Sequence, residues 1–314
     1  MKKDSKNTTN ESFKGGGEMG DLVNAMDWSK TPLGPIESWP PNLWASVSLC
    51  LTSNFPMNII WGPDHIQIYN DSYKVLCGAL HPAVLGQNFK ECWISAWSAI
   101  GEPFELALAG KASFLENQRM FLERNGYPEE TCFTYSLSPI RDSSGEVVGI
   151  FLPVIETTPA MLSRRRTRVL RDIADIEDKA KTLEDTCKLT IEVLSKYAFD
   201  LPMVLLYLLD KDGQYVRLMG ATGLEKGSKA SPKTLDLSAL TKTDWPLDRA
   251  IRSEKTEQVD DFEARFGRIS CGPYPEAIQN SLILPIRGPR LEKPIGFLIV
   301  GKSTRLVHDE AYST

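Results

Sequence analysis

The residues that most suggest chemistry form the segment GFLIVGKS at 296–303, which matches the phosphate-binding pattern G-x-x-x-x-G-K-[ST]. In that pattern a glycine loop after a strand wraps phosphate with backbone N–H groups and then opens a helix. Here the four variable positions, Phe297 to Val300, are bulky and favour an extended strand. We therefore interpret the segment as the last strand of a sheet. A P-loop nucleotide-binding enzyme remains the less favoured alternative.

Other residues that could catalyse a reaction or bind a metal are scattered. The histidines are His65, His81 and His308, and the cysteines stand at 50, 77, 92, 132, 187 and 271 without any C-x-x-C pair. The polar groups Glu116-Asn117-Gln118 and Glu129-Glu130 read as strand and turn residues. We expect no catalytic residues and no metal site, because any pairing of nucleophile and histidine would be arbitrary.

Composition indicates an ordinary globular chain. The 314 residues are 42% apolar and 25% charged, with a formal charge of −5, and this length favours two domains. The run Arg164-Arg165-Arg166 with Arg168 is followed by several acidic residues, so we read it as a solvated helix start. We expect no nucleic-acid partner.

The sequence gives no sign of a membrane partner or of export. No apolar core follows the N-terminal lysines, and no run approaches the roughly 18 apolar residues that span a bilayer. The scattered cysteines suit a reducing compartment. We therefore expect a cytoplasmic location.

The elements that would position these residues begin after a polar stretch. We expect residues 1–26 to be a flexible tail, because they show almost no apolar pattern. Residues 27–158 predict a helix from Asn42, two short strands in MNIIWGP and HIQIYND, a helical middle, and three further strands that include TCFTYSLSPI and EVVGIFLPVIETT. This order predicts a compact α+β domain.

A long connecting helix is expected over 159–198, with its second half serving as the first helix of the next domain. Apolar residues recur there at heptad spacing, which is consistent with a seam between two protomers. The seam candidates are Val169, Ile173, Ile176, Ala180 and Leu183. The alternative is that the second half packs on its own downstream sheet.

Residues 199–314 predict a second α+β domain with a mainly antiparallel sheet. Strands are expected in PMVLLYLLD, QYVRLMGATGL, TEQVDD, NSLILPIRG and KPIGFLIVGKS, with a helix in WPLDRAIRSEK. HDEAYST looks like only the first turn of a closing helix, so we expect this domain to lack that helix.

Several segments carry a resemblance to known signalling domains. WSKTPLGPIESWP, FPMNIIWGPDHIQIYNDSY, HPAVLGQNFKECW and RNGYPEETCFTYSLSPIRDSSGEVVGIF followed by ETT resemble the PAS domains at the front of bacterial sensor histidine kinases. FDLPMVLLYLLDKDG, ATGL, WPLDRAIRSEK, NSLILPIRG and KPIGFLIVGKS resemble a GAF domain. The resemblance implies a PAS-like and a GAF-like antiparallel sheet, each with helices, joined by a long helix.

The resemblance also implies a pocket in each domain for a small ligand or cofactor. The motifs for flavin photochemistry, bilin attachment and cyclic-nucleotide binding are not found in the sequence, so the cofactor is unknown. The pocket candidates are Trp93, Trp97, Phe104, Phe114, His65 and His81.

The resemblance therefore implies a sensory input module of a signal-transduction protein. It would perceive a small molecule, form a homodimer through the connecting helix, and relay a signal to an output domain outside this chain, with a histidine kinase as the expected class. The alternative is a non-sensing dimerisation or protein-interaction scaffold.

Overall fold

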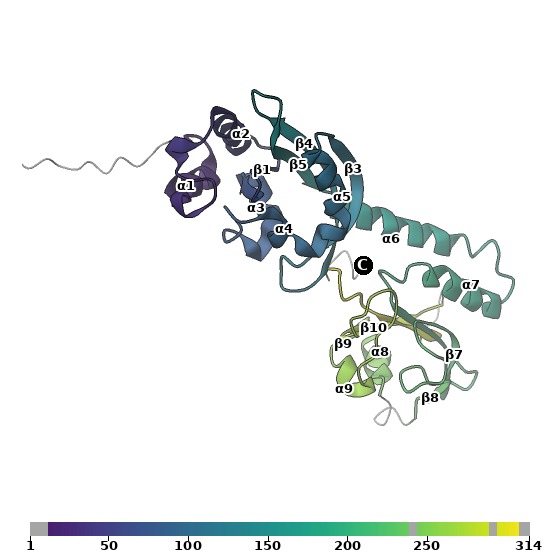
Figure 1. Cartoon of the computed structure of the whole chain (residues 1–314). Helices are drawn as coiled ribbons and strands as arrows, with labels where there is room; N and C mark the ends of the chain where they lie inside the picture. Colours follow the sequence, from purple (N-terminus) through teal and green to yellow (C-terminus); the bar gives the residue numbers. More distant parts are fainter. Residues whose placement is uncertain (1–11, 239–243, 289–293, 308–314) are drawn as a thin grey trace, which may run out of the picture. The chain divides into compact units, whose positions relative to one another are not determined.

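A computed structural model describes residues 12–238, 244–288 and 294–307. The chain divides into two compact units, unit 1 at Met1–Leu162 and unit 2 at Ser163–Thr314. Each unit is built on an antiparallel sheet with helices (Figure 1), so the predicted α+β class with two sheets is confirmed.

The described helices and strands follow one another in this order. The α-helices are α1 (Gly17–Ala25), α2 (Pro41–Thr52), α3 (Asp71–Cys77), α4 (Phe89–Cys92), α5 (Trp97–Leu108), α6 (Thr158–Ala174), α7 (Leu183–Ser195), α8 (Leu247–Ser253) and α9 (Phe262–Phe266). The strands are β1 (Met57–Trp61), β2 (Ile66–Tyr69), β3 (Ser113–Leu122), β4 (Glu129–Arg141), β5 (Val147–Glu156), β6 (Met203–Leu209), β7 (Tyr215–Thr222), β8 (Thr234–Asp236), β9 (Glu257–Val259), β10 (Ser281–Ile286) and β11 (Gly296–Gly301). Short 3-10 helices lie at Trp28–Lys30, Ile36–Ser38, Gly78–Leu80 and Ile94–Ala96.

The sheet of unit 1 has the strand order β2-β1-β5-β4-β3, with every neighbouring pair antiparallel. Helix α2 packs on β1 and β2, and helix α5 packs on β3, β4 and β5. The predicted strands at the start and end of this unit are present. The turn between β4 and β5 has Gly145 at φ +91°, a left-handed conformation that favours glycine.

Residues 12–26 correct the prediction of a flexible tail, because they fold against unit 1. Met19 and Val23 on α1 are fully buried, and Phe13 is nearly so. The Asp71 carboxylate accepts hydrogen bonds from the backbone N–H groups of Glu18 (3.1 Å) and Met19 (2.9 Å) at the start of α1. Three apolar side chains and one distant carboxylate therefore stabilise a segment that is polar overall. Residues 1–11 lie outside the described ranges.

The single helix expected over 159–198 is instead two helices, α6 and α7, separated at residues 175–182. Asp175, Glu177 and Asp178 stand at the C-terminal end of α6, where negative charge is unfavourable. Thr182 then starts α7, because its Oγ1 accepts a hydrogen bond from the backbone N–H of Asp185 at 3.1 Å.

The break also divides the five predicted seam residues. Val169 and Ile173 lie on α6, Ile176 and Ala180 lie in the break, and Leu183 begins α7. Val169 packs against the sheet of unit 2, and Ile176 is buried, so these side chains do not form one continuous apolar stripe.

The sheet of unit 2 has the order β8-β7-β6-β11-β10-β9 among the described residues, again antiparallel throughout. Side chains alternate between its two faces. Phe297 and Ile299 of β11 lie in the core cluster that contains residues of α8 and α9, whereas Leu298 and Val300 pack with Leu194 of α7. Helices therefore cover both faces of this sheet.

Three features of unit 2 differ from the sequence prediction or fall outside it. Strand β8 and helix α9 were not predicted. The predicted absence of a closing helix concerns residues 308–314, which lie outside the described ranges.

Candidate functional site

An internal cavity of about 50 Å³ lies in unit 1 between the sheet and the helices. Its walls come from α3, α4, α5, the segment between α4 and α5, and strands β3, β4 and β5. They are Tyr73, Leu76, Phe89, Trp93, Ile100, Met120, Leu122, Phe133, Tyr135, Leu137, Leu152 and Val154. No charged side chain is among them, so the cavity suits an uncharged, mainly apolar molecule.

The size and the walls of this cavity do not fit the large cofactors named above. Dry apolar cavities in proteins bind benzene at about 150 Å³, and this one is about 50 Å³. Haem also needs an axial ligand, commonly histidine, and no histidine lines the cavity.

The two tyrosines of the cavity are held neutral. Burial raises the pKa of Tyr73 well above its ordinary value, and the nearby Cys77 thiol acts in the same direction. Burial also raises the pKa of Tyr135 to about 12. Neither hydroxyl therefore brings charge into the cavity, and that of Tyr135 donates to the carbonyl oxygen of Ala99 at 3.4 Å.

A pair of buried amides lies beside the cavity. Asn58 on β1 and Gln67 on β2 are both fully buried, and Asn58 Nδ2 donates to Gln67 Oε1 at 2.9 Å. Trp93, a wall residue, donates its indole N–H to the same oxygen at 3.2 Å. Asn58 pairs in register with Leu152, another wall residue, so the amides share the cavity face of the sheet.

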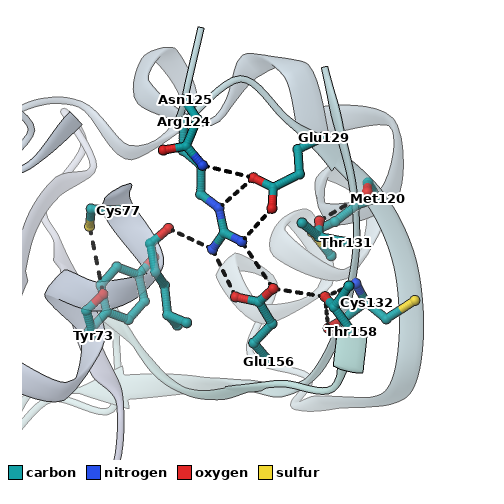
Figure 2. Close-up of polar contacts among 11 residues, drawn as sticks. Tyr73, Cys77, Met120, Arg124, Asn125, Glu129, Thr131, Cys132, Glu156 and Thr158 are labelled. Atoms are coloured by element: carbon teal, nitrogen blue, oxygen red, sulfur yellow. Dashed lines mark hydrogen bonds and ion pairs between the residues drawn. The ribbon is translucent and has the colours of Figure 1, made fainter. Parts of the chain in front are cut away.

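A second polar cluster lies where three strands of unit 1 meet the start of α6 (Figure 2). The Arg124 side chain donates to Glu129 from Nε (2.9 Å) and Nη2 (3.1 Å), and to Glu156 from Nη1 (2.8 Å) and Nη2 (3.0 Å). It also donates to the carbonyl oxygen of Leu76, at 3.2 Å. The guanidinium therefore joins α3, β4 and β5.

The cluster is buried, which sets its electrostatics. Arg124 is 8% exposed and Glu129 6% exposed, so neither charge could be left unpaired without large cost. Burial alone lowers the pKa of Arg124, but the hydrogen bonds that it donates to Glu129 and Glu156 outweigh burial and raise the pKa overall. Arg124 therefore stays a cation held by two carboxylates.

The same cluster reaches the first turn of α6. Thr158 Oγ1 donates to Glu156 Oε1 at 2.8 Å, and the backbone N–H of Cys132 donates to Thr158 Oγ1 at 2.9 Å. A shift of Glu156 therefore acts directly on the residue that begins this helix (Figure 2).

The predicted pocket residues occupy different places. Trp93 lines the cavity. Trp97 and Phe104 lie behind its wall, with their rings 5.2 Å apart and Phe104 stacked on Phe89 at 5.7 Å. Phe114 is 66% exposed on β3 and does not line the cavity, because its position on the strand turns it to the outer face.

The two predicted histidines also lie away from the cavity. His65 has φ +50° in the turn before β2 and its ring meets Phe104 edge-on at 5.0 Å; burial lowers its pKa. His81 Nδ1 is 3.0 Å from the Tyr69 hydroxyl, and its Nε2 is 3.5 Å from a Glu18 carboxylate oxygen. His81 therefore helps to hold α1 in place. His308 lies outside the described residues.

Sequence reasoning missed the Arg124 cluster. It treated Glu129 as a turn residue and gave no role to Arg124 or Glu156. The segment ETT was noted only as part of a resemblance. The one local signal was an arginine and a glutamate flanking the β3–β4 turn, which is common on protein surfaces.

The segment Gly296–Gly301 is strand β11, paired on one side with β6 and on the other with β10. Its backbone N–H groups serve the sheet instead of a phosphate, which agrees with the strand interpretation. Within the described ranges, no cluster of three or more His, Cys, Asp or Glu side chains is placed to hold a metal ion.

In unit 2 the space between the sheet and helices α8 and α9 is filled by aromatic rings. Trp245 and Phe262 are fully buried, and the Trp245 ring lies 4.5 Å from that of Phe266. The Trp245 indole N–H donates to the carbonyl oxygen of Ala230 at 2.9 Å, which fixes the ring.

No family model matches the sequence, and no curated relative matches it. Among solved structures, the chain is similar to the GAF domain from an Acinetobacter phosphoenolpyruvate-protein phosphotransferase, at 18% identity and a TM-score of 0.35, over 48% of this chain and 84% of that one. It is similar to the chromophore-binding domain of a Stigmatella aurantiaca bacteriophytochrome, at 11% identity and a TM-score of 0.32, over 82% of this chain and 88% of that one. A light-oxygen-voltage domain matches at 15% identity and a TM-score of 0.28, over 37% of this chain and 90% of that one. These similarities define neither a family nor a function.

None of the helices in the described ranges combines the length and the apolar character needed to cross a bilayer.

Proposed function

We propose that this chain is the sensory input region of a signal-transduction protein. Unit 1 binds a small molecule in its cavity, and the start of α6 carries the resulting change toward an output domain, for which a histidine kinase is the expected class. All six cysteines are free thiols, which suits work in a reducing compartment such as the cytoplasm.

The observation that carries the proposal is the position of the Arg124 cluster. Strands β3, β4 and β5 supply cavity walls through Leu122, Phe133 and Val154. Arg124 follows the first of these residues closely along the chain, Glu129 precedes the second, and Glu156 follows the third. A displacement of any wall strand therefore reaches the cluster, and through Thr158 it reaches α6.

The physical basis is a population shift. A ligand favours one arrangement of β5 and α6 only if it binds that arrangement better than the other. In the Arg124 cluster one guanidinium bonds two carboxylates on different strands at the same time, so a small displacement of either strand changes the balance between the two sets of hydrogen bonds.

The relay is tested by amide hydrogen exchange of residues 159–170 in cavity variants of the full chain. Met120→Ala enlarges the cavity and should change exchange at the start of α6. Val47→Ala removes a comparable buried side chain on α2, away from the cavity, and should leave that exchange unchanged. Glu156→Gln should abolish the response to Met120→Ala, because it weakens the charge pair with Arg124.

The outcomes separate sensing from scaffolding. If Met120→Ala and Val47→Ala change α6 equally, the effect is general destabilisation and the relay is wrong. If neither variant changes α6, a non-sensing scaffold is the better description.

The proposal includes a homodimer formed through the connecting region. Leu170 and Ile173 on α6 are 69% and 36% exposed and stand three residues apart, so they lie on one side of the helix. Sedimentation equilibrium of the wild type should show a dimer, and Leu170→Glu should shift it to monomer. A monomeric wild type at all concentrations would exclude this part of the proposal.

A further inference from the structure

Two buried amide atoms beside the cavity have no hydrogen-bond partner within the described residues. They are Asn58 Oδ1, an acceptor, and Gln67 Nε2, a donor. Both side chains are fully buried, and buried polar groups in native proteins are almost always satisfied. An unsatisfied acceptor and an unsatisfied donor on two side chains that are hydrogen-bonded to each other therefore require an explanation.

The orientation of the Gln67 amide follows from its neighbours. Its Oε1 receives two N–H donors, one from Asn58 Nδ2 at 2.9 Å and one from the Trp93 indole at 3.2 Å. Exchanging oxygen and nitrogen of Gln67 would place its NH₂ group against both donors. Gln67 Nε2 is thereby left as a donor and Asn58 Oδ1 as an acceptor.

The Asn58 and Gln67 side chains meet residues of the cavity wall described above. Trp93 bonds to Gln67 and lines the cavity, Tyr73 lines it with its hydroxyl beside the Asn58 amide, and Leu152 lines it and is the register partner of Asn58. The apolar space and the polar pair are thus neighbouring parts of one interior face.

We propose that the Asn58–Gln67 pair is the polar end of the ligand site, and that the ligand is a small uncharged molecule with an apolar body and one amide-type group. The amide of the ligand donates to Asn58 Oδ1 and accepts from Gln67 Nε2. This proposal rests on the proposed sensory function, because it concerns the same cavity.

The walls of the site exclude other chemical classes. No charged side chain lines the cavity, so a carboxylate or an ammonium would lose its hydration without a counter-charge. A purely apolar molecule would fill the space but leave both amide atoms unsatisfied. The volume of about 50 Å³ limits the body to a few heavy atoms unless wall residues move.

The test compares three probes on the ¹⁵N-labelled full chain by NMR. Propionamide has the proposed donor and acceptor, propionate is its charged counterpart of equal size, and xenon reports only an accessible apolar cavity. At pH 7 propionamide should shift the Trp93 indole and the Gln67 side-chain signals saturably, and propionate should not. Xenon should shift the signals of cavity-wall residues.

A variant locates the polar contact. Asn58→Leu keeps the shape of the side chain but removes the Oδ1 acceptor together with the Nδ2 donor to Gln67, and it should weaken propionamide binding at least tenfold while xenon binding persists. The xenon signal also reports whether the variant is folded. If the variant does not fold, the comparison of propionamide with propionate on the wild type decides alone.

Each result has one meaning. Equal effects of propionamide and propionate, or xenon shifts without propionamide shifts, would overturn the ligand class and leave the cavity as a sensor site. A response to none of the three probes would overturn both this inference and the ligand-sensing function.

Discussion

At the scale of the residue, one guanidinium, that of Arg124, holds the buried carboxylate of Glu129 and the half-buried carboxylate of Glu156. Replacing it by methionine leaves Glu129 and Glu156 without their cation in a largely buried setting. Removing one partner of a buried ion pair costs about 3–5 kcal/mol. We expect Arg124→Met to lower the free energy of unfolding of unit 1 by about this amount, measured by urea denaturation.

The control is Lys111→Met, which removes a cation at an exposed position after α5. Surface substitutions of this kind change stability by about 0.5 kcal/mol or less. A similar loss in both variants would mean that the buried cluster contributes no more than a surface cation.

Glu276 and Arg305 give a prediction about pH. Arg305 donates to both Glu276 oxygens, at 2.7 and 3.1 Å, and this hydrogen bonding holds the pKa of Glu276 below its ordinary value of 4.5. A carboxyl with a lowered folded pKa stabilises the fold above its unfolded pKa, and that stabilisation is lost as pH falls. The pair is partly exposed, so its contribution is below about 1 kcal/mol.

Arg305→Met should therefore lower the free energy of unfolding at pH 6, and lower it by a smaller amount at pH 3. Urea denaturation at the two pH values measures the difference. Arg268→Met, at an exposed position, is the control and should change stability equally at both values. A constant loss in Arg305→Met at both pH values would contradict the assigned role of Glu276.

At the scale of the element, α1 depends on a carboxylate far away in sequence. Asp71 accepts from two N–H groups at the start of α1, and such caps stabilise a helix by about 1 kcal/mol. Asp71→Ala should speed amide exchange in residues 17–25. Asp21→Ala, an exposed change within α1, should not. Equal exchange in both variants would show that Met19 and Val23 hold the helix without the cap.

Local patterns in the sequence predict the helices and strands in which apolar residues recur at regular spacing or in a continuous run. The alternation at Phe133, Tyr135 and Leu137 correctly indicated β4, and the apolar run at 203–209 indicated β6. The short helix α1 has too few apolar residues for a periodic signal. The heptad pattern did not indicate the break between α6 and α7, because it concerns only the apolar positions. The acidic residues that follow α6 lie between those positions.

The candidate site was predicted only in part, because its contacts are distant in sequence. Trp93 was named from its type and its place in a helical segment. The bonds from Arg124 to Glu156 and from Asn58 to Gln67 depend on strand order and register, which local patterns do not contain. The void beside Trp93 depends on packing of twelve wall residues from three helices, the segment between two of them, and three strands.

At the scale of the whole molecule, two compact units predict two unfolding transitions. Calorimetry should show that Arg124→Met lowers the transition temperature of unit 1. Phe297 is fully buried in unit 2, so Phe297→Ala should lower the free energy of unfolding of that unit by about 3–5 kcal/mol and with it the transition temperature of unit 2. A single transition that both variants lower equally would mean that the units unfold as one cooperative body.

The position of β11 has a consequence for synthesis on the ribosome. This strand comes late in the chain, yet it lies in the middle of its sheet, between β6 and β10. Until β11 emerges, the edges of β6 and β10 that it pairs with stay open, and open apolar strand edges invite association with other chains. Unit 1 is complete well before that moment, since its strands end at Glu156. The nascent chain therefore carries a folded domain followed by an unfinished one, which makes its second half a natural client for chaperones during translation.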